Sequence, residues 1–452
     1  MDKIKKMLRR INMNIVYTVL VSLVVVAPIF TVIFRALDIE GDTEISLIIT
    51  KVVGYIGLLV AIVKIISMLI SNKFKWLKNK RLIPLALFFC FLVWALIVCF
   101  FARDMYKAFN GYTYRNEGFY TYLAYGGICF LACMITPKSK KIICNIMIFT
   151  AIVLVVLGAI DFEKKEDIFP HWDTLSSVFT NPNHYGYFLV IPTICSFGLL
   201  MTEKWYYKIA YAVAFVALLS TLINTGTVGS YSAVFICVIG IIIYHIVSKK
   251  KFVYGFIGLC VLVICTLFLQ SAFLKETIVI DAKKSIEEFW ALFNEDADIV
   301  KNLYNSEIKH FKELKGPERR VAEYGSGRFL LWINSIKLIK QSPIVGYGME
   351  NVTEKMLGGG SGSPHNLIFS VTLFTGIPGA LFYFLGVGLV LIKARTRLKK
   401  LEPVEVITYF SCVGYLISSM FGISKYYTSP YFFVFFGMLY GIWLLPVMKK
   451  NK

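Results

Sequence analysis

The chain has 452 residues, of which 57% are hydrophobic and only 17% are charged. Soluble globular domains carry about 25% charged residues, so this composition excludes an ordinary soluble protein. The formal net charge of +20 would suit a nucleic-acid-binding protein, but the basic residues flank long apolar runs instead of clustering in one folded segment. We therefore expect a membrane protein without a nucleic-acid partner.

About twelve apolar blocks are long enough to cross a bilayer, which takes about 20 residues per helix. The blocks are continuous and do not alternate with polar residues, so they predict helices and exclude the strands of an outer-membrane barrel. No small-residue cleavage pattern follows the first block, which predicts a retained span. The sequence thus predicts an all-α polytopic membrane protein whose spans cover residues 14–34, 45–70, 82–102, 119–136, 142–160, 184–202, 206–224, 229–247, 252–270, 366–392, 405–423 and 431–448.

The basic residues alternate between the two sides of these spans. With the N-terminus "MDKIKKMLRR" in the cytoplasm, the cytoplasmic segments hold roughly 26 Lys and Arg, against roughly 7 in the short external loops. This pattern predicts a multi-pass protein of the cell (plasma or inner) membrane with both termini in the cytoplasm. It also explains the net charge as topology and attraction to anionic lipid headgroups.

One external segment, 271–365, is far longer than an ordinary connection. It contains helix-period apolar positions, most clearly in "SGRFLLWINSIKLIKQSP", where Ser326 is the expected N-cap and Pro343 the stop. We therefore divide the chain into spans 1–9 (1–270), an extracytoplasmic helical cap (271–365) and spans 10–12 (366–452).

Arg328 falls in the first turn of the predicted cap helix, four residues before Trp332. A guanidinium beside a helix N-terminus with free N–H groups forms a good anion site. The alternative is an ordinary surface arginine packed on Trp332. Gly346 and Gly348 follow the helix and allow a close backbone approach, although a tight turn explains them equally well.

The segment "GGGSGSPHN" then leads into the tenth predicted span. Its glycines predict a hinge that admits a substrate, and they lack the Lys-Ser/Thr that would follow in a P-loop. His365 and Asn366 would lie at the outer mouth of the span, where packed polar groups indicate a functional site, although a loop histidine is more often solvated.

A similar junction precedes the sixth span, where Asn181, Asn183 and His184 either offer hydrogen bonds in a water-facing vestibule or form an Asn-Pro turn. His171 and Asp173 could act as an acid/base or metal pair, but two candidate ligands without a third do not predict a metal site. The ten cysteines all fall inside predicted spans, without disulfide or metal spacing. We expect neither a metal nor another cofactor.

Taken together, these segments resemble the signature region of the O-antigen ligase and O-antigen polymerase superfamily. The resemblance rests on an arginine, a tryptophan four residues later, Pro then Gly-x-Gly, and His-Asn opening a span with Gly-x-x-Gly. "FTNPNHYG" is similar to the family's Asn-Pro-Asn element. In this sequence the signature residues are Arg328, Trp332, Pro343, Gly346, Gly348, His365, Asn366, Gly376 and Gly379.

The sequence departs from the family at "NTGTVGSYSAV", residues 224–234, where relatives commonly carry Ser-Arg. If that arginine grips a lipid-linked diphosphate, another cation must replace it here. Arg103, Arg115 and Lys425 are the external candidates.

The resemblance implies an inverting, metal-independent glycosyltransferase of the C type that takes glycan from an undecaprenyl-diphosphate carrier outside the membrane. In that chemistry Arg328 would bind the diphosphate, His365, with an ordinary pKa of about 6.5, would be the general base, and Asn366 would orient the imidazole or the sugar. Our first hypothesis is a polymerase that joins lipid-linked repeat units into a capsule or similar polysaccharide, with a flippase and a chain-length regulator as partners. The alternatives are a ligase of the same superfamily, a transporter or flippase for lipid-linked glycan, and a non-catalytic assembly protein.

Overall fold

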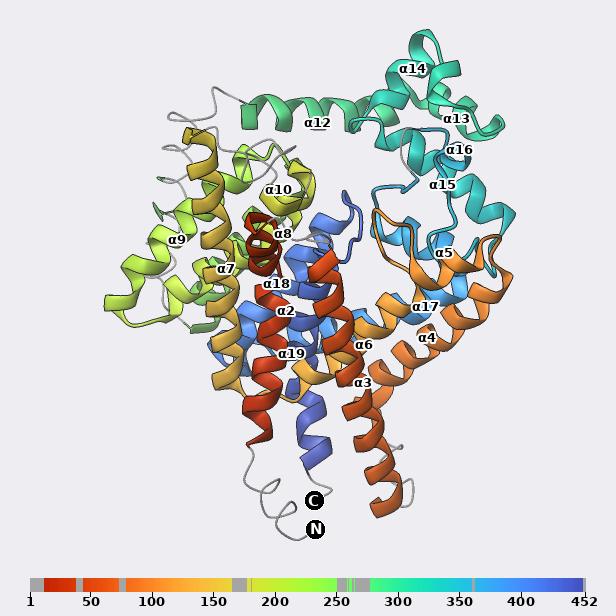
Figure 1. Ribbon diagram of the computed structural model, residues 1–452. Coiled ribbons are helices and arrows are strands. Elements are labelled where there is room, and N and C mark those ends of the chain that lie inside the picture. Colours follow the sequence, from red (N-terminus) through yellow and green to blue (C-terminus); the bar gives the residue numbers. More distant parts are fainter. Residues whose placement is uncertain are drawn as a thin grey trace.

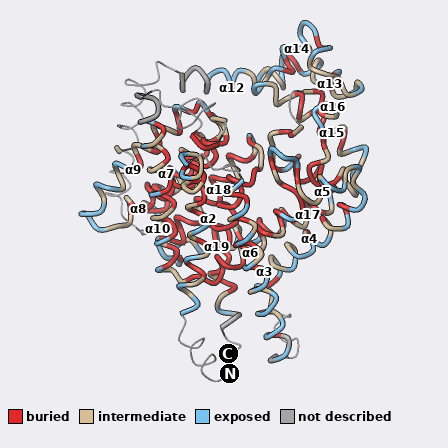
Figure 2. Tube along the Cα trace, viewed as in Figure 1, coloured by how far each residue is buried: buried red, intermediate tan, exposed pale blue. Residues whose placement is uncertain are grey.

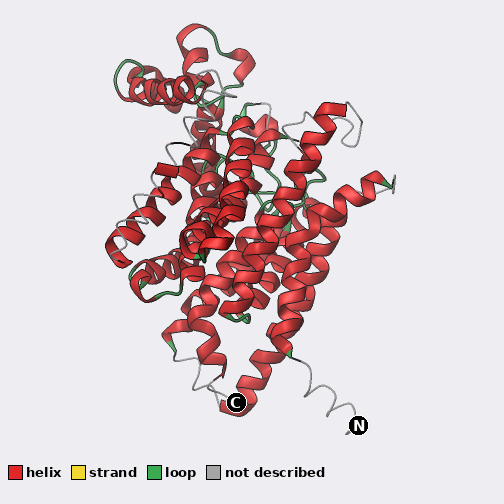
Figure 3. Ribbon diagram, turned by 90° about the vertical axis from the view of Figure 1, so that its left-hand side faces the viewer, coloured by secondary structure: helices red, strands yellow, loops and turns green. Residues whose placement is uncertain are grey.

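The computed structural model describes residues 12–37, 44–72, 79–164, 177–179, 181–249, 258, 260–261, 264, 277–359 and 362–449. Every regular element in these ranges is a helix, as Figure 3 shows. The spans run roughly side by side, with both termini at one end of the bundle and a group of short helices at the other (Figure 1). The predicted all-α polytopic membrane fold is confirmed.

Nine of the described helices are long and apolar enough to cross a membrane: α2 (Met13–Ala36), α3 (Ile45–Asn72), α4 (Ile83–Phe101), α7 (Pro137–Lys164), α8 (Pro182–Thr202), α9 (Trp205–Asn224), α10 (Val228–Lys249), α17 (Leu367–Arg395) and α19 (Ser429–Lys449). Two further predicted spans correspond to α6 (Phe119–Cys133) and α18 (Pro403–Ser419), which are shorter than expected. The predicted span 252–270 lies almost wholly outside the described residues. The remaining short elements are α5 (Met105–Asn110) and the 3-10 turns η3 (Lys80–Leu82), η4 (Ser177–Phe179), η5 (Phe311–Glu313) and η6 (Leu398–Lys400).

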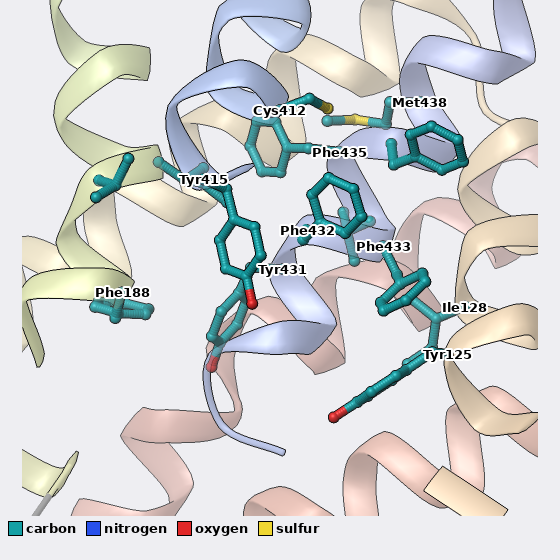
Figure 4. Close-up of a cluster of buried hydrophobic side chains, with 14 of the residues drawn as sticks. Tyr125, Ile128, Phe188, Cys412, Tyr415, Tyr431, Phe432, Phe433, Phe435 and Met438 are labelled. Carbon is teal, nitrogen blue, oxygen red and sulfur yellow. The ribbon is translucent and has the colours of Figure 1, made fainter. Parts of the chain in front are cut away.

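Aromatic side chains from several spans fill the centre of the bundle. Burial is greatest around α8, α18 and α19, whereas the peripheral spans expose apolar residues, as expected where lipid covers them (Figure 2). In the close-up of Figure 4, Tyr415 stacks on Phe432 with ring centroids 5.0 Å apart, and Tyr125 stacks on Phe433 at 4.7 Å. These contacts join α6, α18 and α19 into one core.

The short helix α6 lies between α3 and α19 with almost no side chain separating the backbones. A Cβ on Gly127 would lie 1.8 Å from the carbonyl oxygen of Gly54 in α3. On the other side, Gly437 and Gly441 of α19 form a Gly-x-x-x-Gly pair that faces the carbonyls of Cys129 and Cys133. Small residues of this kind allow membrane helices to approach closely and gain van der Waals contact.

Helix α17 is broken at Gly376, which has φ 67° and ψ 179°. Pro378 has no N–H, so the carbonyl of Phe374 loses its helical donor. The N–H groups of Tyr347 and Gly348 replace the missing donors by bonding to the carbonyls of Leu373 at 2.8 Å and Phe374 at 3.1 Å. Backbone that leaves the helix within a span must find such partners, because lipid offers none.

Two more bonds complete this attachment. Ile377 donates to the carbonyl of Pro343 at 2.8 Å, and the indole of Trp94 in α4 donates to the carbonyl of Thr375 at 2.7 Å. We call the segment 343–348 the latch, because it fastens the end of the preceding helix to the break in α17.

We expect Gly376→Ala to destabilise the protein by about 2 kcal/mol or more, because alanine is strained at this φ and its Cβ would lie 1.9 Å from the Ile344 carbonyl oxygen. Gly388→Ala, further along α17, is the matched control: its Cβ would meet nothing within 4 Å, so it should be neutral or gain up to about 1 kcal/mol. Thermal unfolding of the two purified variants would measure the difference, and equal melting temperatures would contradict the latch.

Five helices lie between α10 and α17 in the chain, and we refer to them as the cap. They are α12 (Thr277–Phe293), α13 (Ala297–Asn305), α14 (Gly316–Glu323), α15 (Arg328–Gln341) and α16 (Glu354–Leu357). In Figure 1, α12 runs across the top of the molecule, at a steep angle to the spans. The cap has a small apolar core of its own, made of Leu303, Leu314, Val321, Ala322, Leu330 and Ile333.

Candidate functional site

A cavity of about 840 Å³ lies between the cap and the adjacent ends of the spans. Its wall combines Asn183 at the start of α8, the segment His310–Glu313, the start of α15 with Arg328, the α16 region with Glu354 and Lys355, and His365 ahead of α17. The cavity thus opens at the end of the bundle opposite to the termini. It brings together Asn183, Arg328 and His365, which are far apart in the sequence.

Helix α15 places Arg328 at its first residue. The predicted helix is present, but its N-cap is Gly327, with φ 82°, and not Ser326 as expected. Gly325, Ser326 and Gly327 all have positive φ, so the chain turns sharply before the helix. The turn is held by Glu288 of α12, whose carboxylate accepts from the Gly325 N–H at 2.9 Å.

Arg328 lines the cavity and, among the described residues, forms no ion pair with a carboxylate. The described contacts also include no packing of this guanidinium on the ring of Trp332, which the alternative interpretation requires. The N-terminus of α15 offers fewer free N–H groups for an anion than expected. The N–H groups of Arg328 and Phe329 already donate to the carbonyls of Gly325 and Tyr324, both at 3.3 Å.

His365 adopts a left-handed backbone with φ 51°, a conformation that non-glycine residues rarely take. The residue is mostly enclosed. Burial, and then the nearby charges of Arg328 and Arg115, lower the pKa of its imidazole to about 4. Arg328 and His365 therefore line the same cavity, and the charge of Arg328 contributes to the lowered pKa of His365.

Trp332 and Asn366 hold the His365 segment in place. The Trp332 indole donates to the carbonyl of Pro364 at 2.9 Å, and its ring packs near Phe369 and Phe421. The Asn366 side chain caps α17 by accepting from the N–H groups of Ile368 and Phe369 and donates to the carbonyl of Met420 at 3.0 Å. Both side chains therefore position the histidine, and the bonds of Asn366 go to backbone and not to the imidazole.

The two asparagines before the sixth predicted span have different environments. Asn181 is the N-cap of α8 and accepts from the N–H of Asn183 at 2.8 Å, which is the Asn-Pro turn that the sequence allowed. Asn183 lines the cavity and accepts from the Thr227 hydroxyl at 3.5 Å. His171 and Asp173 lie outside the described residues.

Gly346 and Gly348 belong to the latch and not to the cavity wall. A Cβ on Gly346 would lie 2.5 Å from the Leu373 carbonyl oxygen, and one on Gly348 would lie 2.4 Å from the Cβ of Ala102. Their φ values of 66° and 89° also require glycine. In this structure the two glycines serve the fit between the latch and α17.

Of the three cations considered as replacements for the family arginine, Arg103 is exposed. Arg115 is buried and its Nε donates to both carboxylate oxygens of Glu350, at 3.0 and 2.9 Å. Burial raises the pKa of Glu350 while Arg115 opposes that rise. Lys425 is completely buried and bonds to the hydroxyl of Tyr427 at 2.6 Å.

Several residues around the site escaped sequence reasoning. His310 and Glu354 line the cavity, and Glu117 is fully buried near Glu350, where burial raises its pKa to about 8. A charged residue just outside a predicted span was a usable signal for Glu117. No sequence signal paired Arg115 with Glu350, since the two lie 235 positions apart.

Part of the chain is similar to a known family. No curated protein matches the chain. Residues 213–384 match the family model described as O-antigen ligase, a range that includes Arg328, Trp332, the latch and His365. The resemblance to the O-antigen ligase and polymerase superfamily seen in the sequence is thus confirmed over this region.

Proposed function

We propose that the protein is an extracytoplasmic glycosyltransferase that polymerises undecaprenyl-diphosphate-linked oligosaccharide units into a surface polysaccharide. The observation that carries this proposal is the shared cavity of Arg328 and His365 at the cap end of a multi-pass membrane protein. The family match supports a glycosyltransferase-like enzyme that acts on lipid-linked glycan. The positive-inside pattern supports an outward-facing cap, with the termini in the cytoplasm.

In the proposed reaction, an acceptor hydroxyl attacks the anomeric carbon of the donor glycan from the face opposite to the diphosphate. The new bond is C–O to the acceptor, the bond that breaks is C–O to the diphosphate, and the electron pair leaves with the diphosphate. Charge develops on that leaving group, and the guanidinium of Arg328 stabilises it. The imidazole of His365 takes the acceptor proton.

The lowered pKa of His365 changes the expected pH profile. A base must be neutral, and with a pKa of about 4 the imidazole stays neutral as the pH falls from 7 to 5, whereas an ordinary histidine would be protonated. The pH dependence of kcat/KM reports the ionisation of the free enzyme, so we expect kcat/KM to fall only when the pH approaches 4. Initial rates of purified protein would give this profile. A fall in kcat/KM already near pH 6.5 would contradict the lowered pKa of His365.

A ligase would use the same residues with a different acceptor. Purified protein supplied only with lipid-linked repeat units separates the two functions, since chain growth on a gel requires a polymerase. If transfer occurs only when another acceptor is added, the protein is a ligase.

A flippase is the candidate from a different class. It would move labelled lipid-linked glycan across a proteoliposome membrane without forming glycosidic bonds. The residues that define the site lie in and beside the cap and not at the middle of the spans, where transporters bind their substrates. Transport by protein that never lengthens the glycan would overturn the enzymatic proposal.

A further inference from the structure

Lys425 is a buried cation that the proposed reaction does not use. It lies in the segment between α18 and α19, and its side chain has no exposed surface. Its ammonium donates to the Tyr427 hydroxyl and lies against the ring face of Tyr114. An ammonium has three donors, yet within the described part of the chain no carboxylate forms an ion pair with it.

A small cavity of about 160 Å³ has Lys425 among its lining residues. Its lining is rich in hydroxyl groups and contains no acidic residue; it consists of Pro28, Thr31, Ser46, Thr113, Tyr114, Val178, Phe179, Lys425, Tyr426 and Tyr427. Hydroxyls can donate to the oxygens of an anion, and the lysine supplies the charge. Thr31 and Ser46, whose hydroxyls lie 2.7 Å apart, come from the ends of the spans α2 and α3.

Burying an ammonium without a carboxylate partner is costly, and cations kept at such a cost often have a functional role. Burial, and then the nearby charge of Arg115, lower the pKa of Lys425 to about 6, against the opposing effect of Glu350. A bound anion would compensate the missing charge and favour the protonated amine.

Lys425 is linked by hydrogen bonds to the wall of the Arg328 cavity. The Tyr427 hydroxyl, which accepts from Lys425, lies 3.0 Å from Nδ1 of His184, in the first turn of α8. The preceding residue, Asn183, lines the Arg328 cavity and accepts from the hydroxyl of Thr227. The first turn of α8 therefore lies between Lys425 and that cavity.

We propose that the cavity at Lys425 is a second anion site, separate from the Arg328 cavity, which binds the phosphate groups of a lipid-linked substrate. This inference rests on the proposed function. A polymerase brings together two carrier-linked substrates, so it must accommodate two diphosphates at once. Arg328 faces the diphosphate that leaves, and Lys425 holds the diphosphate that the acceptor retains.

Equilibrium dialysis of the purified full-length protein in nanodiscs tests the proposal, with labelled farnesyl diphosphate and inorganic diphosphate as probes. We expect two equivalents of farnesyl diphosphate on the wild type, and at least a tenfold weaker second equivalent in Lys425→Met and in Tyr427→Phe. Lys425→Arg should retain it. Undiminished binding by Lys425→Met, or equal affinity for inorganic and farnesyl diphosphate, would overturn the assignment to a carrier lipid.

Separate control experiments test whether the variants fold and whether the proposed reaction fails. Lys425→Met removes a buried amine that has no ion-pair partner among the described residues, so its melting temperature should equal or exceed that of the wild type. His365→Asn should bind both equivalents while losing polymer synthesis. If His365→Asn makes polymer but Lys425→Met still loses binding, the reaction proposed for His365 fails and the anion site stands. If His365→Asn makes no polymer but Lys425→Met binds both equivalents, the proposed reaction stands and the second anion site fails.

The pH dependence provides a second readout. Lys425 must take up a proton when the anion binds, so between pH 6.5 and 8 wild-type affinity should fall, relative to Lys425→Arg, by about tenfold per pH unit. The other titratable or charged groups around Lys425 are Arg115, Glu350, His184, Tyr114 and Tyr427, and comparison with Lys425→Arg cancels their contribution. A constant ratio of the wild-type and Lys425→Arg affinities between pH 6.5 and 8 would contradict binding of the anion by Lys425.

Discussion

His365→Asn should reduce polymer synthesis by about 10²- to 10⁴-fold, the usual contribution of a general base. Asparagine is the informative replacement because it tolerates the left-handed backbone at φ 51° better than alanine does. It also keeps a polar side chain of similar reach but cannot accept a proton at neutral pH. The amount and length of lipid-linked polymer formed by purified protein would measure the effect.

His310→Asn is the matched control, since His310 lines the same cavity. His310 caps the turn η5, and asparagine can replace it there, so we expect near-normal synthesis. Equal melting temperatures of the two variants would show that the loss at His365 is chemical. Polymer of normal amount from His365→Asn would remove the imidazole from the reaction.

Arg328→Lys should lower kcat by about 10²-fold or more even though the charge is retained. A guanidinium binds two phosphate oxygens with a fixed fork of N–H donors, whereas an ammonium on a flexible stem acts as a point charge. Stabilisation of charge that develops in the transition state is typically worth 10²- to 10³-fold in kcat for one donor. Single-turnover rates with a lipid-linked donor would isolate this step from product release.

Arg319→Lys is the control for the cap, because Arg319 in α14 is half-exposed and forms a surface ion pair with Glu323, one turn away. Its guanidinium also lies over the ring of Phe311, a contact that a lysine ammonium can keep. Such surface pairs contribute about 0.2–1 kcal/mol at most, so synthesis should be unchanged. If Arg328→Lys matches Arg319→Lys, the guanidinium of Arg328 is not needed for turnover.

Local signals in the sequence predicted the spans and α15 well. Long apolar blocks can satisfy their backbone in lipid only as helices, and the period of Phe329, Trp332 and Ile333 indicates one face of a helix. The place of the site was also predictable, because alternate loops lie on one side of a membrane. Asn183, Arg328 and His365 had to share that side.

The roles of single residues were harder to predict, because they depend on partners distant in the sequence. Asn366 looked like a substrate ligand, yet it caps α17 and bonds to Met420. Gly346 and Gly348 looked like part of a binding loop, yet they fit against the break in α17. The periodicity of a sequence cannot predict that the N–H groups of one segment will bond to the carbonyls at a break in another helix.

The latch sets a mechanical limit on the cap. Residues 343–348 are bonded to α17 on one side, and Asn366 begins the same helix on the other, so both exits from the cavity wall are fixed to one rigid body. In the proposed reaction, a bulky glycan would therefore not enter by detachment of this part of the cavity wall. It would enter beside Lys312 and Lys355, which line another part of the cavity, while the proposed base His365 stays in place.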